Sequence, residues 1–229
     1  MPSSYAVVVA LLEPLMSVLF KRDFRGLERI PRTGGVILAA NHLSVADPFA
    51  VGLFVHSAGR RPHFMAKASL FRLPLAGSLL RGLGQIPVHR YSADARLSLT
   101  AAADAVRAGS IVVIYPEGTT THDLDYWPMR ARTGVARLAI ETGAPVVPLG
   151  QWGAQQFLGR RGRFRPLPRK TLQLRAGPPV QLSAWAGAKM DASTLRGCTD
   201  AIMTDITALV AEIRAQPAPR TGGDKRRTV

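Results

Sequence analysis

The sequence predicts a single α/β domain with a mainly parallel central sheet flanked by helices, and two patterns carry that prediction. Short apolar runs rich in β-branched residues, each bordered by Gly or Pro, are typical of strands buried on both faces. Helical stretches with a periodic apolar face alternate with these runs. With 229 residues and 47% hydrophobic content, the chain is long enough for one well-packed core and short for two. The strand-like runs are residues 34–41, 62–68, 84–90, 109–118 and 143–150, and the helical stretches are residues 92–108, 133–142 and 198–214.

An apolar segment, YAVVVALLEPLMSVLF at residues 5–20, lies near the start of the sequence. A bilayer core requires about 20 consecutive apolar residues, whereas this segment is shorter and carries Glu13 and Pro14 in its middle. No basic region precedes it and no small-residue cleavage site follows, so we do not expect a signal peptide. We expect residues 1–22 to form an apolar helix, or two short helices broken at Pro14. This segment would pack on the domain or lie in the membrane interface.

The helical stretches have recognisable ends and apolar faces. Residues 92–108 begin at Ser92, a good N-cap, and stop at Gly109. The apolar positions on one face are Leu99, Ala102, Ala103 and Val106 in the first helix and Ile202, Ile206, Leu209 and Ile213 in the last.

In a sheet of this type, sites form beyond the carboxyl ends of the strands. His42 and Glu117 both stand at such ends.

The last residues differ in composition from the rest. We expect the α/β domain to occupy residues 23–215 and the basic stretch QPAPRTGGDKRRTV, residues 216–229, to be a disordered tail. Cys198 is the single cysteine, so no intramolecular disulfide can form. We interpret it as a small buried hydrophobic residue in a protein from a reducing compartment.

His42 and Asp47 lie five positions apart in AANHLSVADPFAV, directly after an apolar run. One interpretation is chemical: Asp47 accepts a hydrogen bond from the imidazole, fixes its tautomer and stabilises the imidazolium formed when His42 removes a proton from a hydroxyl. The other is structural: Asp47 caps the helix that Pro48 begins, and His42 bonds a backbone group. These residues by themselves leave both open.

Two further stretches suggest anion binding. In IVVIYPEGTTTHD, residues 111–123, an apolar strand runs into a turn where Gly118 exposes backbone donors and the threonines add hydroxyls. Such a turn suits a phosphate or an oxyanion. LGQIPVHR ends on Arg90, whose guanidinium can hold two phosphate oxygens. An ordinary turn and a solvated Arg remain the structural alternatives.

Taken in order, NHLSVAD, GQIPVHR, YPEGT and APVVPL resemble the four sequence blocks of the glycerolipid acyltransferases of the lysophosphatidic acid acyltransferase (1-acylglycerol-3-phosphate O-acyltransferase) type. The resemblance runs from about Arg25 to Gly150. It implies that His42 and Asp47 are the catalytic pair. It also implies that Arg90 holds the phosphate of the acceptor.

The third block maps onto residues 116–119, so the resemblance assigns Glu117, Gly118 and Thr119 to acceptor binding. The family usually continues Gly-Thr-Arg-Ser, and here two further threonines, residues 120–121, replace the Arg and Ser. A cation is therefore missing from the turn. Arg132, which stands where relatives commonly have Lys, is the residue that we expect to compensate, with Arg130 nearby.

The implied reaction moves a fatty acyl group from acyl-CoA or acyl carrier protein to a hydroxyl of lysophosphatidic acid, giving phosphatidic acid in phospholipid synthesis. Glycerol 3-phosphate and another lysolipid are the alternative acceptors. Because a thioester is already activated, the transfer requires a base, a donor for the oxyanion, and positioning, but no cofactor, metal or covalent nucleophile. His42 would be the base and Asp47 would orient it. Arg90, with Glu117 as an anchor behind the site, would locate the acceptor.

The net charge of +15 suggests a polyanionic neighbour, and an anionic membrane surface suits a lipid enzyme. GRRGRFRPLPRK, residues 159–170, holds six cations that would be attracted to anionic lipid. We expect a peripheral or monotopic protein on the cytoplasmic face of the cell membrane. A solvated loop is the structural alternative, and a basic nucleic-acid-binding module is the alternative function. Because no base-stacking aromatic pattern or known binding motif accompanies the cations, we expect no nucleic acid partner.

Overall fold

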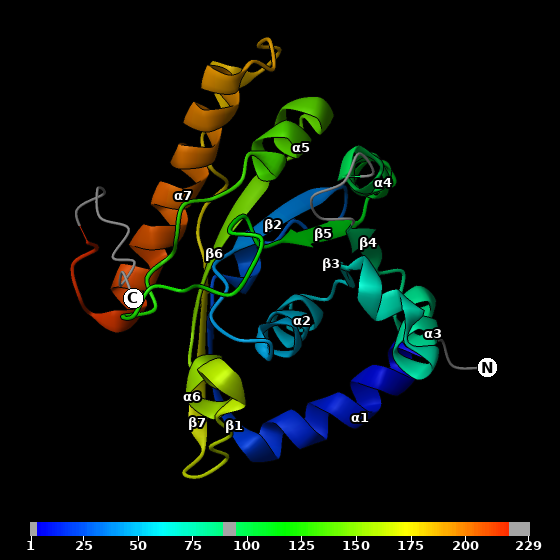
Figure 1. The fold of residues 1–229 in the computed structure, drawn as a ribbon, viewed down its shortest axis with the longest axis vertical. Helices are drawn as coiled ribbons and strands as arrows, with labels where there is room; N and C mark the ends of the chain where they lie inside the picture. The colour runs from blue at the N-terminus through cyan, green and yellow to red at the C-terminus, as the bar shows by residue number, and fades with distance from the viewer. Residues whose placement is uncertain (1–3, 89–94, 220–229) are drawn as a thin grey trace.

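A seven-stranded sheet runs through the middle of the protein, with helices on both faces (Figure 1). The structure, a computed structural model, describes residues 4–88 and 95–219. Among these residues the strand order is β1-β7-β6-β2-β5-β3-β4, and every neighbouring pair is parallel except β6 with β7. The prediction of a mainly parallel sheet flanked by helices is confirmed. The strands are β1 (Phe20–Arg25), β2 (Val36–Ala40), β3 (Pro62–Lys67), β4 (Ile86–Val88), β5 (Ile111–Ile114), β6 (Val146–Trp152) and β7 (Lys170–Ala176).

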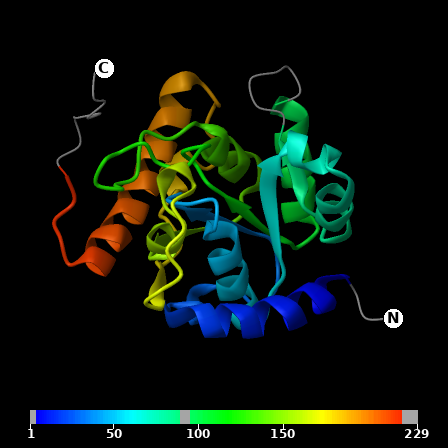
Figure 2. The same ribbon diagram turned by 60° about the horizontal axis from the view of Figure 1, so that its bottom comes forward.

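The helices form two layers because successive residues of the central strands face opposite sides of the sheet. Val36, Leu38 and Ala40 of β2 pack into one core with α1, α2 and α6. Ile37 and Ala39 face the other core, with α4, α5 and α7. Figures 1 and 2 show α2 and α1 on one side of the sheet and α5 and α7 on the other. The α-helices are α1 (Ser4–Leu19), α2 (Asp47–Ser57), α3 (Pro74–Gly82), α4 (Ala95–Arg107), α5 (Gly134–Thr142), α6 (Ala154–Phe157) and α7 (Ala192–Arg214), and the short 3-10 helices are η1 (Leu27–Arg29), η2 (Ala68–Arg72), η3 (Arg160–Gly162) and η4 (Ser183–Trp185).

The N-terminal segment is one continuous helix, as in the first of the two predicted alternatives, and the alternative of two helices broken at Pro14 is wrong. Helix α1 includes Pro14 in its interior, and the side chain of Arg22 bonds both the carbonyl and the carboxylate of Glu13, which ties the helix to β1. Met16 is buried against the core. Our boundary at residue 22 falls inside β1, which pairs with β7. No helix in the described part of the chain is long and apolar enough to cross a bilayer.

The remaining predicted elements appear with shifted bounds. The run at residues 34–41 is β2, and the helix expected at residues 198–214 begins earlier, at Ala192, with Asp191 as its cap. Cys198 is fully buried in the second core, and burial raises the pKa of its thiol. The expected tail lies mostly outside the described residues, so its disorder stays a prediction.

Candidate active site

The site begins at the carboxyl end of β2, which lies near the centre of the sheet. All five residues of β2 are buried, and the next residue, Asn41, is fully buried as well. Asn41 and Gln151 of β6 bond each other reciprocally: the backbone N–H of Gln151 donates to Asn41 Oδ1 at 2.8 Å, and Asn41 Nδ2 donates to the carbonyl of Gln151 at 3.1 Å. This clamp fixes the chain immediately before His42. No sequence pattern pointed to either residue.

His42 and Asp47 are in direct contact, with Nδ1 of the imidazole 2.9 Å from Oδ2 of the carboxylate. Asp47 is completely buried, while the side chain of His42 keeps 14% of its surface exposed. The same Oδ2 also accepts hydrogen bonds from the backbone N–H groups of Leu43 at 2.6 Å and Ser44 at 2.9 Å. The carboxylate therefore both shapes the loop and fixes the imidazole.

The cap interpretation of Asp47 does not match this geometry. The N-cap position of α2 is Ala46, and no side chain bonds the first N–H groups of the helix. Asp47 is the first helical residue, and its carboxylate turns back to Leu43 and Ser44, which precede the helix. The pairing with His42 is the chemical alternative that the sequence analysis left open.

An aromatic ring covers one face of His42. Tyr115 stacks on the imidazole with ring centroids 4.1 Å apart and an interplanar angle of 16°. Burial, and secondarily the nearby charge of Asp47, raises the pKa of Tyr115 well above its ordinary value, so the phenol stays neutral. The stack restricts the plane of the imidazole. Sequence reasoning missed Tyr115, although it directly precedes the PEG turn.

Glu117 holds two segments of backbone together. Its Oε1 accepts the N–H of His42 and its Oε2 accepts the N–H of Met129, each at 2.9 Å. The residue is only 4% exposed. Burial raises the pKa of Glu117 to about 8, against the lowering effect of these two hydrogen bonds. With both oxygens engaged, Glu117 has the geometry of an anchor behind the site.

The turn after β5 brings Gly118 and Arg132 together. Gly118 has a φ of 73°, which a residue with a side chain adopts at a cost. A Cβ at Gly118 would lie 3.1 Å from Cδ and Nε of Arg132, so the Arg side chain crosses the turn closely. The N–H of Arg132 also donates to the carbonyl of Pro116 at 2.9 Å. The structure thus brings Arg132 to the third block, with half-buried Thr119 next to Gly118.

Thr121, which replaces the family's Ser, has a structural use. It is 1% exposed, its N–H donates to the carbonyl of His42 at 2.7 Å, and its hydroxyl donates to the carbonyl of Trp127 at 2.8 Å. Of the predicted site residues, Arg90 lies outside the described residues. Its phosphate contact stays a prediction.

The other described histidines lie in settings typical of packing or surface residues. His56 shares a 3.1 Å hydrogen bond with the hydroxyl of Tyr5 on α1. His63 bonds the carbonyl of Gly84 at 2.8 Å, and the side chain of His122 is exposed. His89 lies outside the described residues.

An α/β sheet with a partly exposed His bonded to a buried Asp at the end of its central strand has the parts needed to take a proton from a hydroxyl. The chain belongs to the Acyltransferase family, whose model matches residues 21–152.

Among curated proteins, the chain is similar to the chloroplastic 1-acyl-sn-glycerol-3-phosphate acyltransferase BAT2 of Brassica napus, with 28% identity over 61% of this chain and 39% of that protein. It is also similar to the 1-acyl-sn-glycerol-3-phosphate acyltransferase of Borreliella burgdorferi, with 29% identity over 58% of this chain and 51% of that protein. A third relative is the lyso-ornithine lipid O-acyltransferase of Pseudomonas aeruginosa, with 31% identity over 50% of this chain and 42% of that protein. The chain spans about half, or less, of the length of these relatives.

A solved structure shares the fold. The 1-acyl-sn-glycerophosphate (LPA) acyltransferase PlsC from Thermotoga maritima superimposes with a TM-score of 0.69, covering 93% of this chain and 81% of that chain. At 21% sequence identity this match supports the fold alone.

Proposed function

We propose that this protein transfers a fatty acyl group from acyl-CoA, or from acyl carrier protein, to the free hydroxyl of lysophosphatidic acid. The observation that carries the proposal is the 2.9 Å contact between His42 and the fully buried Asp47, in a chain of the Acyltransferase family. Relatives named as 1-acyl-sn-glycerol-3-phosphate acyltransferases support this choice of acceptor.

The geometry supports a general-base mechanism without a covalent enzyme intermediate. Because Nδ1 of His42 is bonded to Asp47, Nε2 is the nitrogen that would remove the proton from the acceptor hydroxyl. The hydroxyl oxygen then attacks the thioester carbonyl, and the tetrahedral oxyanion collapses with loss of the thiolate. The thiolate leaves as a thiol with the proton that His42 carries. Asp47 stabilises the imidazolium between these steps.

The acceptor phosphate would lie beside the turn after β5. Arg132 crosses Gly118 at close range and restores a cation to a turn from which the family's usual Arg is missing. Arg90 would add a second contact. Glu117 acts from behind by holding the backbone of His42.

A lysolipid with a different headgroup is the second candidate acceptor. The residue that replaces the family's Ser, Thr121, is buried and bonded to the protein's own backbone, and one relative is named as a lyso-ornithine lipid O-acyltransferase. The assay that separates the two candidates measures thiol release from oleoyl-CoA with lysophosphatidic acid, monoacylglycerol or lyso-ornithine lipid as acceptor. Preference for lysophosphatidic acid supports the first candidate, and equal use of monoacylglycerol removes the phosphate requirement.

Helix α1 would bring the site to the cytoplasmic face of the membrane as a peripheral or monotopic surface. One side of α1 packs on the domain through Met16. The other side exposes an apolar stripe at successive turns of the helix. Helix α3, which lies next to α1 (Figure 2), is accompanied by further exposed leucines. The stripe consists of Val7, Leu11, Leu15 and Val18, and the exposed residues around α3 are Leu70, Leu73, Leu75 and Leu79.

A further inference from the structure

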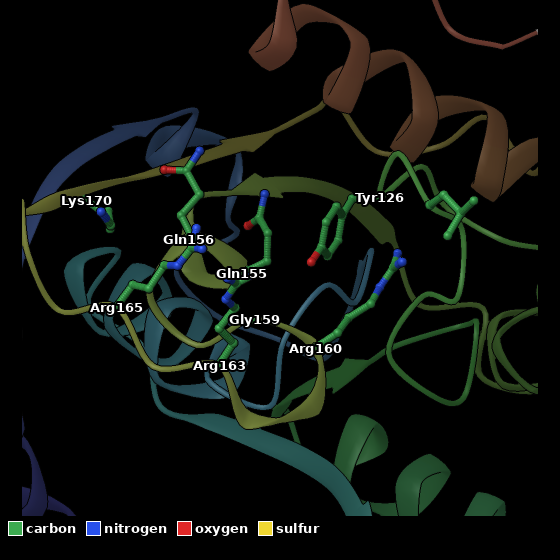
Figure 3. Close-up of a pocket in the computed structure, with 9 residues that line it drawn as sticks. Tyr126, Gln155, Gln156, Gly159, Arg160, Arg163, Arg165 and Lys170 are labelled. Carbon is green, nitrogen blue, oxygen red and sulfur yellow. The ribbon is translucent and has the colours of Figure 1, made fainter.

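A basic cavity lies on the β6 side of the site (Figure 3). Its volume is about 740 Å³, within the range of small-molecule sites. Its lining carries four cations and no carboxylate. The lining residues are Leu124, Tyr126, Gln155, Gln156, Gly159, Arg160, Arg163, Arg165 and Lys170.

The cavity contains a buried polar group that points to a ligand. Gln155 is 6% exposed, and its Oε1 accepts the N–H of Gly153 at 2.8 Å. Its Nε2 donor is buried and has no hydrogen-bond partner among the described residues. A buried donor without a partner is costly, and an anionic acceptor group bound in the cavity would satisfy it.

Ordered structure holds the Arg160 side chain and the backbone of the loop that carries two other cations. Arg160 lies over the ring of Tyr126, with its guanidinium carbon 4.2 Å from the ring centroid, and its Nε and Nη2 also have no hydrogen-bond partner in the described chain. The loop that carries Arg163 and Arg165 is closed by two backbone bonds, from Gly159 N–H to the Arg163 carbonyl at 2.9 Å and from Arg165 N–H to the Phe157 carbonyl at 2.8 Å. These side chains surround Gln155 in Figure 3.

The cavity is connected to the catalytic loop and is separate from the turn after β5. The hydroxyl of Ser44, two residues after His42, donates to the carbonyl of Leu158 at 2.6 Å. Strand β2 lies between β6 and β5 in the sheet. The Gly118 turn follows β5, whereas Gln155 follows β6. His42 therefore stands between two places that can hold an anion.

We propose that this cavity binds the phosphate groups of the CoA part of the acyl donor, an inference that rests on the proposed function. CoA carries a diphosphate and a 3′-phosphate, and the cavity offers four cations. The phosphate of lysophosphatidic acid is only a few bonds from the reacting hydroxyl, so it must bind beside His42. The phosphates of CoA are separated from the thioester by the long pantetheine arm, which suits a cavity whose lining does not include His42.

Two substitutions test the cavity by different means. Gln155→Glu keeps the acceptor for the Gly153 N–H and replaces the unpartnered donor with a carboxylate oxygen. Arg163→Gln removes one exposed cation, so it should not disturb the fold. It therefore keeps the test valid if Gln155→Glu fails to fold. Arg137→Gln, on exposed α5 surface outside this cavity, is the control for net charge. Thermal unfolding of each variant shows whether it is folded.

The measurements are direct binding of CoA, dephospho-CoA and adenosine 3′,5′-bisphosphate, followed by KM values for oleoyl-CoA and for the acceptor. Loss of one charge-assisted hydrogen bond corresponds to about a tenfold change in affinity or more. We expect both cavity variants to bind CoA about tenfold more weakly and to raise the donor KM similarly, with the acceptor KM and the control unchanged. Unchanged CoA binding in the folded variants, no CoA binding by the wild type, or a rise in the acceptor KM alone would overturn the assignment. Because binding is measured without turnover, an inactive wild type that binds CoA through these residues would count against the proposed function and not against the cavity.

Discussion

Replacing Asp47 by Asn tests whether its carboxylate serves proton transfer. The amide oxygen of Asn can still accept the N–H groups of Leu43 and Ser44, so we expect the loop and the fold to persist. What is lost is the negative charge next to the imidazolium that forms during transfer. At about 4 Å between charge centres and an effective dielectric constant of about 20, this attraction is worth about 4 kcal/mol. In the structure, Nδ1 of His42 and Oδ2 of Asp47 are 2.9 Å apart, so the charge centres, which lie further back in each group, are separated by about 4 Å.

A loss of that size corresponds to about a thousandfold lower kcat. We expect KM values for both substrates to change little, because the Asp47 side chain is fully buried. The assay is thiol release from oleoyl-CoA in the presence of lysophosphatidic acid, with His42→Ala as the more complete loss. Asp104→Asn, an exposed carboxylate on α4, serves as the control for the charge change. Wild-type kcat in a folded Asp47→Asn protein, or in His42→Ala, would refute the mechanism.

Three further predictions concern Glu117, Arg132 and α1. Glu117→Gln offers one acceptor to two backbone N–H groups, so it should lower the free energy of unfolding by about 1–3 kcal/mol. Because the folded pKa of Glu117 is raised from 4.5 to about 8, its stabilising contribution is present below pH 4.5 and is lost as the pH rises to 8. Urea unfolding across this range should show a pH slope in the wild type that is weaker in Glu117→Gln, and parallel profiles would contradict the role of this carboxyl. Arg132→Ala should raise the KM for lysophosphatidic acid about tenfold and leave that for monoacylglycerol unchanged; an equal rise for both acceptors would exclude a phosphate contact. Leu11→Gln with Leu15→Gln should weaken sedimentation with anionic vesicles at least tenfold without lowering the melting temperature, because these side chains are 71% and 54% exposed; unchanged sedimentation would mean that α1 does not bind the membrane.

The sequence was sufficient to predict strands β2 to β6 and insufficient for β1 and β7, which pair with each other at one side of the sheet. The run at residues 34–41 is buried on both faces, so its composition alone marks a strand. Strand β1, FKRDFR, lies at the edge of the sheet and has a polar composition, so hydrophobicity does not reveal it. Strand β7 alternates buried Leu172 and Leu174 with polar residues, and the preceding run of cations obscures that pattern.

For the candidate site, spacing and resemblance identified the residues that are close in sequence to a motif, and could not identify those joined only by the fold. His42 and Asp47 are five positions apart and share one loop. Gln151 reaches Asn41 across 110 positions because β6 and β2 are neighbours in the sheet. Tyr115 contacts His42 only because β5 pairs with β2, and no short-range pattern contains that information.

His42 is held from several directions, and this arrangement explains why residues remote from the substrate should affect kcat more than KM. Glu117 accepts its N–H, Thr121 donates to its carbonyl, and Asp47 bonds its Nδ1. Tyr115 restricts the plane of the ring. Each contact fixes position or tautomer before the substrate arrives, so the cost of ordering the base is met during folding. In the proposed mechanism, loosening the Asp47 or Tyr115 contact would therefore slow proton transfer while both substrates still bind at the two proposed anion sites.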